Sequence, residues 1–313
     1  MNRLRLGLFA LFCLGLAGCV EGETMYTVNP DGSTKVRMEI VTAVPPSFGG
    51  PPKKKDAAED TPEGMLRQSV RSMLENPKLA AWKDVSAEIL PNGKLKFSGT
   101  AYIRQLSDFA KQGGLPVLSP SLAVERTPDG AFKLVRRENS NPERAPDPNK
   151  RKPKTPEEIK KMTDAQLDTE ILRELIEIQS GKGLIVAVFN ECKLKATFVL
   201  PGEVTEAKGF VREGNKASFT IDGNKIIADI NKVLSLDRPT LRKAFRDAKE
   251  PEVFKSLILG DTAGDGSVTV AKPGQPLFDF DKEVKEAHAA YPELRKKFGF
   301  DDDLRLPGEM LKK

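Results

Sequence analysis

Histidine, cysteine and tryptophan are scarce in this chain, whose 313 residues include one His, three Cys and one Trp. The sole imidazole belongs to His288, so a zinc site built from several histidines is excluded, and any Ser-His-Asp or Cys-His arrangement would have to use this residue. Phosphate-binding loops of the types GxxxxGK(S/T) and GxGxxG are absent, as is the GxSxG elbow of hydrolases. These absences remove the commonest zinc, nucleotide and serine-hydrolase sites.

A strong charge of either sign is also missing. Lys and Arg number 50 against 45 Asp and Glu, the formal net charge is +5, and hydrophobic residues make up 39% of the chain. This composition is typical of a soluble globular protein, and the length suits about two domains or one domain with long insertions. A chain of this size buries enough surface to fold without the help of disulfides or metals.

The first residues have the pattern of a targeting signal. Arg3 and Arg5 precede an apolar run over residues 6–17, which is too short to span a bilayer and has the length of a signal-peptide core. The run ends in Leu16-Ala17-Gly18-Cys19, which resembles the lipobox of bacterial lipoproteins. The resemblance implies cleavage between Gly18 and Cys19, removal of residues 1–18, and a diacylglycerol thioether on Cys19. We therefore expect the membrane to be a partner through acylated Cys19.

The remaining cysteines agree with this expectation. Cys13 would leave with the signal peptide, so the processed chain would retain Cys192 and no pair for an intramolecular disulfide. We expect Cys192 to be a small core residue. The predicted location is the cell envelope, on the extracytoplasmic side of a membrane. Val20 stands where an Asp often retains such proteins at the inner membrane, and the choice between inner and outer membrane stays open.

Hairpin signals predict an α+β fold with antiparallel sheet. Residues 24–44, 82–103 and 121–138 each contain two strand-like runs around a Pro-Asp-Gly or Pro-Asn-Gly turn, in which Pro presets φ and Gly accepts a positive φ. Further strands are predicted at 184–189, 194–200, 216–221 and 267–271. Helices are predicted at 62–75, 157–180 with a break at Thr163, 226–236, 240–248, 253–259 and 280–298. The helices at 62–75 and 157–180 are expected to pack on the sheet.

These elements suggest an order of segments along the chain. After the signal peptide we expect a lipidated α+β segment over residues 19–138, which contains a mobile Pro- and Lys-rich loop at 45–60. A basic, Pro-rich linker follows at 139–155. A helix and strands occupy 156–225, and 226–313 is mainly helical. The sequence leaves open whether the β-containing halves form one sheet or two lobes.

One stretch resembles a known family. The run Phe198-Val199-Leu200-Pro201-Gly202-Glu203-Val204, the turn Glu206-Ala207-Lys208-Gly209 and the strand Ser218-Phe219-Thr220-Ile221-Asp222-Gly223 are similar to the β-rich core of the LppM-type bacterial lipoprotein domain. That family also begins with a lipobox, followed by a strand and an Asp-Gly turn. The resemblance implies an α+β envelope domain near the membrane that binds lipid or glycolipid, and it supplies no catalytic residues.

Candidate sites for chemistry are few. His288 lies at the border of an apolar helix face, with no nucleophile at a matching spacing. Residues 260–267 start like a calcium loop, but Lys272 occupies the position where a bidentate Glu is required, so the pattern favours an ordinary turn. The acidic run 301–303 is read as a solvated end. We expect no metal site, no cofactor and no catalytic residue.

Two basic clusters are the strongest charge feature. They consist of Lys53, Lys54, Lys55, Lys150, Arg151, Lys152 and Lys154, all in Pro-rich segments. Such clusters contact anionic membrane surfaces, where each cation contributes about 1 kcal/mol, or remain as solvated loops without a partner. Basic residues do not alternate with aromatic ones, and the predicted compartment holds little nucleic acid, so no nucleic-acid partner is expected.

Together these features predict a membrane-anchored, non-enzymatic envelope lipoprotein that binds lipid, glycan or a protein partner. The alternatives are an envelope hydrolase with a carboxylate-only site and a scaffold subunit of an envelope complex. Acidic residues close together in an apolar cleft would favour the hydrolase. A long apolar tunnel would favour the lipid binder, and a flat exposed apolar patch would favour the scaffold.

Overall fold

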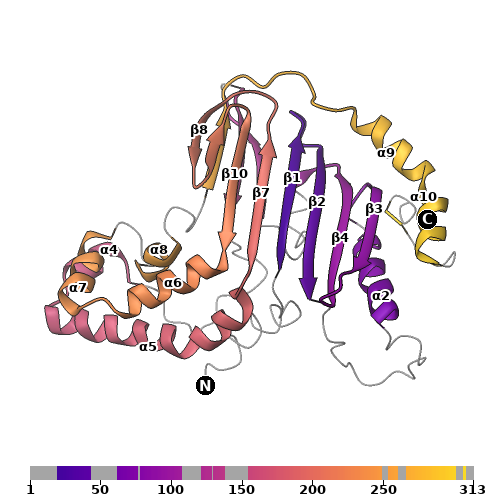
Figure 1. Cartoon of the computed structure of the whole chain (residues 1–313). Helices are drawn as coiled ribbons and strands as arrows, with labels where there is room; N and C mark the ends of the chain where they lie inside the picture. Colours follow the sequence, from indigo (N-terminus) through magenta and orange to yellow (C-terminus); the bar gives the residue numbers. More distant parts are fainter. Residues whose placement is uncertain are drawn as a thin grey trace.

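The computed structural model describes residues 20–43, 62–76, 78–107, 121–128, 130–137, 154–248, 253–259, 266–300 and 306–307. These residues form an α+β structure with two sheets and helices at one end and along one edge, as the sequence predicts (Figure 1). Within these ranges, no helix has both the length and the apolar character needed to cross a bilayer. The predicted loop at 45–60 and nearly all of the predicted linker at 139–155 lie outside the described residues.

The larger sheet has seven strands in the order β3-β4-β2-β1-β7-β10-β9. Their bounds are β1 Glu21–Val28, β2 Thr34–Ala43, β3 Ala81–Ile89, β4 Lys94–Ile103, β7 Lys193–Val199, β9 Val211–Glu213 and β10 Lys216–Asp222. The hairpins β1–β2 and β3–β4 are confirmed, and the turn residues Gly32 and Gly93 have positive φ. Strand β1 also pairs with β7 in parallel, so segments on both sides of the predicted linker share one sheet.

The smaller sheet has four antiparallel strands in the order β5-β6-β11-β8. They are β5 Ser121–Arg126, β6 Phe132–Arg137, β8 Val204–Lys208 and β11 Gly266–Val270. The third hairpin, predicted at 121–138, is therefore present but belongs to a different sheet from the first two. Apolar residues of both sheets, including Tyr26 and Phe198 of the larger and Phe132 and Val268 of the smaller, are buried in one core.

Three helices pack against the larger sheet. Helix α2 (Pro62–Leu74) lies against β3, and its Val70 and Leu74 are fully buried. The predicted helix at 280–298 is two helices, α9 (Phe280–Ala289) and α10 (Tyr291–Phe298). The break falls at Ala290 because Pro292 has no N–H to donate to the preceding turn, so a continuous helix cannot pass through it.

The remaining helices form a separate layer with its own core. They are α4 Pro156–Lys160, α5 Asp164–Phe189, α6 Gly223–Leu234, α7 Arg238–Asp247 and α8 Val253–Leu259. The expectation that the helix at 157–180 packs on the sheet is wrong: α5 packs against α6 and α7 instead. The buried residues of this layer, among them Leu167, Ile171, Leu241 and Phe245, form a cluster distinct from the core of the sheets. The predicted break at Thr163 is confirmed, since Thr163 is the N-cap of α5.

The strand predicted at 184–189 is also wrong, because these residues continue helix α5. A six-residue apolar run has no periodicity that separates a strand from a buried helix segment. Gly181 and Gly183 do not end the helix, since glycine in a helix interior costs only about 1 kcal/mol relative to alanine. Helix α5 therefore has 26 residues and is about 39 Å long at 1.5 Å per residue.

Candidate functional site

Strands β1 and β7 begin side by side, at the end of the larger sheet nearest to the helical layer (Figure 1). The backbone N–H of Lys193 donates to the carbonyl oxygen of Val20 at 2.9 Å, and Glu21 pairs with Lys193 in the parallel register. Val20 is 5% exposed. The first described residue of the chain is thus already fixed in the sheet. We call this region the β1–β7 end.

Helices α5 and α6 meet at the same place. The N–H of Cys192 donates to the carbonyl of Phe189 at 2.9 Å, and the N–H of Gly223 donates to the carbonyl of Cys192 at 2.7 Å. Glu191 has a φ of +58° and its N–H donates to Oδ1 of Asn224 at 3.3 Å. Cys192 is buried, as the sequence predicts. The end of α5, the starts of β1 and β7 and the start of α6 are therefore joined by backbone hydrogen bonds into a rigid corner.

The predicted lipidation residues immediately precede this corner in the sequence. Cys19 directly precedes Val20 in the sequence, and both Gly18 and Cys19 lie outside the described residues. The basic cluster Lys53 to Lys55 and the residues Lys150, Arg151 and Lys152 are also outside them. Lys154 is described, is partly buried, and stands just before Thr155, the N-cap of α4.

The outward face of α5 was not predicted from the sequence. Helix α5 crosses the base of the molecule, with α6, α7 and α8 on its sheet side (Figure 1). Leu172 and Ile176 are 46% and 59% exposed on its free face. Next to them an open groove of about 420 Å³ runs between α5 and α6, lined by Leu175, Ile176, Gln179, Ser180 and Leu234. The signal in the sequence was Leu172 and Ile176, four residues apart within the predicted helix at 157–180.

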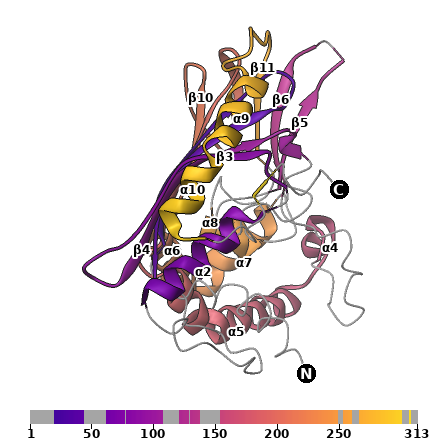
Figure 2. The same ribbon diagram turned by 90° about the vertical axis from the view of Figure 1, so that its right-hand side faces the viewer.

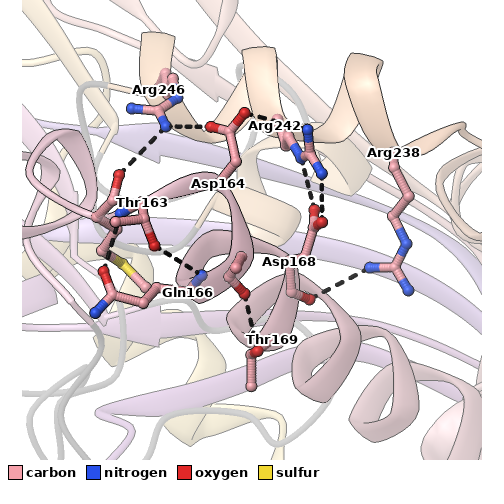
Figure 3. A network of polar contacts seen from close by, with 10 residues as sticks. Thr163, Asp164, Gln166, Asp168, Thr169, Arg238, Arg242 and Arg246 are labelled. Carbon is pink, nitrogen blue, oxygen red and sulfur yellow. Dashed lines mark hydrogen bonds and ion pairs between the residues drawn. The ribbon is translucent and has the colours of Figure 1, made fainter.

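Arginines of α7 hold the first turns of α5 (Figure 3). The carboxylate of Asp168 accepts from Nε of Arg242 at 2.7 Å and from a second nitrogen of the same guanidinium. Asp164 accepts from Arg246 at 2.6 Å and from Arg242 at 3.3 Å. The hydrogen bond from Arg242 lowers the pKa of Asp168 below its ordinary value. These ion pairs fix the orientation of α5 against α7.

Helix α9 is attached to the sheet by a second polar cluster. The carboxylate of Glu283 accepts from Nζ of Lys35 at 2.9 Å and from the hydroxyl of Tyr102 at 2.8 Å. Burial and the bond to Glu283 raise the pKa of Tyr102. His288 Nε2 lies 2.8 Å from the carbonyl oxygen of Ala80, and because a carbonyl only accepts, this nitrogen carries the proton. The structure thus places His288 in a contact between α9 and the start of β3.

The acidic candidates for a cation do not fall within the described chain. Asp261 and Asp265 of the calcium-like loop, and the run 301–303, lie outside the described residues. Among the residues that are described, no group of three or more His, Cys, Asp or Glu side chains is arranged to hold a metal ion.

Comparison with known proteins gives one distant similarity. No family model and no curated protein matches the chain. Among solved structures, the chain is similar to the NMR structure of the folded domain of the Mycobacterium tuberculosis LppM protein, with 15% sequence identity and a TM-score of 0.27. The match covers 66% of this chain and 83% of that domain. At this identity and TM-score the similarity assigns the chain to no family and carries no function.

Proposed function

We propose that this chain is a membrane-anchored bacterial envelope lipoprotein that binds a lipid, glycan or protein partner at the membrane surface without catalysing a reaction. The observation that carries the proposal is the position of Val20, which follows Cys19 in the sequence. Val20 is already hydrogen-bonded to Lys193 in the β1–β7 end. An acyl group on Cys19 would therefore hold a folded domain, and the open apolar groove beside α5, directly at the surface of the membrane.

The polar clusters of the described residues support a binding role. Asp164 and Asp168 are engaged with arginines of α7, and Glu283 with Lys35 and Tyr102. Each of these clusters joins two elements of the fold, so its carboxylates stabilise the contact between those elements. The groove between α5 and α6, by contrast, is open and lined mainly by leucine and isoleucine, which suits contact with an apolar partner.

Metabolic labelling with a fatty-acid analogue tests the anchor. The wild-type chain is expected to incorporate the label and to enter the detergent phase on Triton X-114 partitioning, whereas Cys19→Ser should lose both properties. Cys13→Ser is the matched control, because Cys13 lies upstream of the cleavage site and its loss should leave acylation intact. The anchor proposal is wrong if Cys19→Ser still enters the detergent phase and the wild type takes up no label.

Native mass spectrometry of the gently purified processed chain tests the partner. A stoichiometric co-purified lipid would support lipid binding. A mass equal to that of the acylated chain alone would point to a glycan or protein partner, to be sought by crosslinking in intact cells.

A further inference from the structure

The β1–β7 end leaves no room for a flexible tether between the anchor and the domain. One peptide bond separates Cys19 from Val20, and consecutive Cα atoms are about 3.8 Å apart. Val20 is buried, and its carbonyl is held by Lys193. The polar headgroup layer of a bilayer is about 5–7 Å thick on each side. With its acyl chains in the hydrocarbon, a lipidated Cys19 would therefore bring the β1–β7 end to the headgroups.

Helix α5 ends at this corner. Its last residue, Phe189, accepts the hydrogen bond of Cys192, next to Lys193. From there the helix passes across the base of the molecule, and both views show it on the side opposite to the top of the sheets (Figures 1 and 2). The β1–β7 end and helix α5 therefore lie at the same end of the molecule.

The free face of α5 carries an uncharged stripe. It consists of six exposed residues at spacings of three and four along the helix: Thr169, Leu172, Ile176, Gln179, Gly183 and Ala187. Such spacing places them in one row on the helix surface. Asp168 is four residues before Leu172 and therefore lies next to this row, where its carboxylate is paired with Arg242. Two charged residues flank the row. Arg173 is paired with Glu170, and Glu177 is exposed, so its carboxylate can remain in water.

We infer that the α5 stripe lies on the outer surface of the bilayer, so that the domain is docked flat on the membrane and not merely attached to it. The inference rests on the proposed function, since it takes Cys19 to be the anchor. Leu172 and Ile176 enter the boundary between headgroups and acyl chains, and the groove of α5 and α6 opens at the same level. Because the anchor already confines the domain to the surface, a weak apolar contact is enough to fix its orientation.

A second copy of the chain fits this face less well. A standard protein interface buries about 800 Å² on each partner. Among the described side chains of α5, Leu172 and Ile176 are the large apolar ones with substantial exposure. Contact with a bilayer requires no complementary surface of that size. The anchor, next to the end of the same helix, would already hold α5 close to the membrane.

Because the six residues of the stripe are uncharged, we can predict how docking depends on the charge of the lipid. Docking through α5 should occur on zwitterionic vesicles and should change little between low and high salt, because apolar contact is not screened. The basic clusters around Lys53 and Lys150 would instead require anionic lipid and would lose contact in high salt. The two modes of contact are therefore separable in one experiment.

Quenching of tryptophan by brominated lipid tests the docking. The native Trp82 is 1% exposed and provides an unquenched baseline. Gln179→Trp adds an indole to the α5 stripe, and Glu206→Trp adds one to β8, which lies at the opposite end of the molecule (Figure 1). The acylated chains are reconstituted in phosphatidylcholine vesicles with and without brominated acyl chains. Quenching of most of the added fluorescence is expected for Gln179→Trp and none for Glu206→Trp.

A charged variant shows whether the stripe causes the contact. Adding Leu172→Glu and Ile176→Glu to Gln179→Trp should abolish the quenching while acylation and thermal stability are retained, since both side chains are exposed. Val211→Glu, at a site that is 72% exposed on β9, should leave the quenching unchanged. The inference is overturned if the acylated Gln179→Trp chain is not quenched; the face would then be open to a protein partner.

A chemical anchor distinguishes a failure of docking through α5 from a failure of the proposed acylation of Cys19. The chain from residue 19 is coupled through the Cys19 thiol to a maleimide lipid in the same vesicles. Quenching of Gln179→Trp in this form, with no acylation of the wild type in cells, would support the docking geometry and reject the natural anchor. The absence of quenching in both forms would reject the docking geometry itself.

Discussion

Gly223 lies against the carbonyl group of Phe189, so closely that a Cβ at residue 223 would overlap the carbonyl oxygen. This contact closes the corner where α5, β7 and α6 meet, because the N–H of Gly223 also donates to the carbonyl of Cys192 at 2.7 Å. The groups in conflict are all backbone, so no side-chain rotation can relieve the overlap. The conformation of the β1–β7 end therefore requires glycine at this position.

We predict that Gly223→Ala destabilises the protein severely, by several kcal/mol, because overpacking against backbone forces α5 and α6 apart. Urea unfolding followed by circular dichroism measures the change. Gly183→Ala is the matched control within α5: its Cβ would meet nothing within 4 Å, so it should stabilise the helix by about 0.5–1 kcal/mol. Equal effects of the two substitutions would contradict the packing at residue 223.

We predict an acid-sensitive contribution from Asp168. Arg242 lowers the pKa of this carboxyl in the folded state, so the ion pair stabilises the fold above the ordinary Asp pKa of about 3.8 and loses this effect as the pH falls through the folded pKa. The difference in unfolding free energy between wild type and Asp168→Asn should be largest near pH 7 and should disappear at strongly acidic pH. A difference independent of pH would mean that the ion pair does not contribute.

We predict that Tyr26 and Tyr102 remain protonated until the protein unfolds in alkali. Burial raises the pKa of both, and the bond to Glu283 raises that of Tyr102 further. Because the folded pKa is raised, this stabilisation is complete below pH 10 and is lost as the pH rises above that value. Absorbance of phenolate should therefore appear together with loss of circular dichroism. Phenolate absorbance from more than one tyrosine in the folded state would contradict the burial of these two rings.

We predict that Tyr102→Phe loosens α9 from the sheet. The substitution removes one hydrogen bond to the carboxylate of Glu283 and leaves the ion pair with Lys35, at a cost of about 1–2 kcal/mol. Hydrogen exchange of the peptide that covers α9 should become faster in the variant. Lys243→Ala, at an exposed site on α7, is the control and should leave exchange in α9 unchanged.

We predict that the single tryptophan reports on the core of the larger sheet. Trp82 is buried and packs edge-to-face on Phe97, with ring centroids 5.7 Å apart. Its emission should be blue-shifted and resistant to acrylamide in the folded protein, and should move to the red in the same transition that removes the circular dichroism signal. A native emission maximum typical of exposed indole would contradict this packing.

Local chemistry made several features of the fold predictable. Pro-Asp-Gly and Pro-Asn-Gly turns with alternating apolar residues predicted the hairpins of β1–β2, β3–β4 and β5–β6 correctly, and Gly32, Gly93 and Gly130 have the positive φ that such turns need. The break predicted at Thr163 coincides with the start of α5, where the Thr163 side chain accepts a hydrogen bond from an N–H of the first helical turn. These signals depend only on neighbours in the chain.

The predictions that failed concern contacts between distant segments. The apolar run at 184–189 was read as a strand because a short run fits a strand and a buried helix equally well, and packing against α6 decides between them. Turn chemistry gives no information about which strands become neighbours, so the sequence did not show that the third hairpin belongs to a separate sheet.

The sequence by itself determined the signal-like N-terminus, the lipobox pattern around Cys19, the hairpins and the helix break at Thr163, because each depends on a few adjacent residues. The tertiary structure alone decided that β1 pairs in parallel with β7, that Val20 therefore lies at the end of α5, and that Leu172 and Ile176 stay uncovered. The physical reason is that strand pairing and burial are settled by the sum of contacts across the whole core, which no single segment encodes.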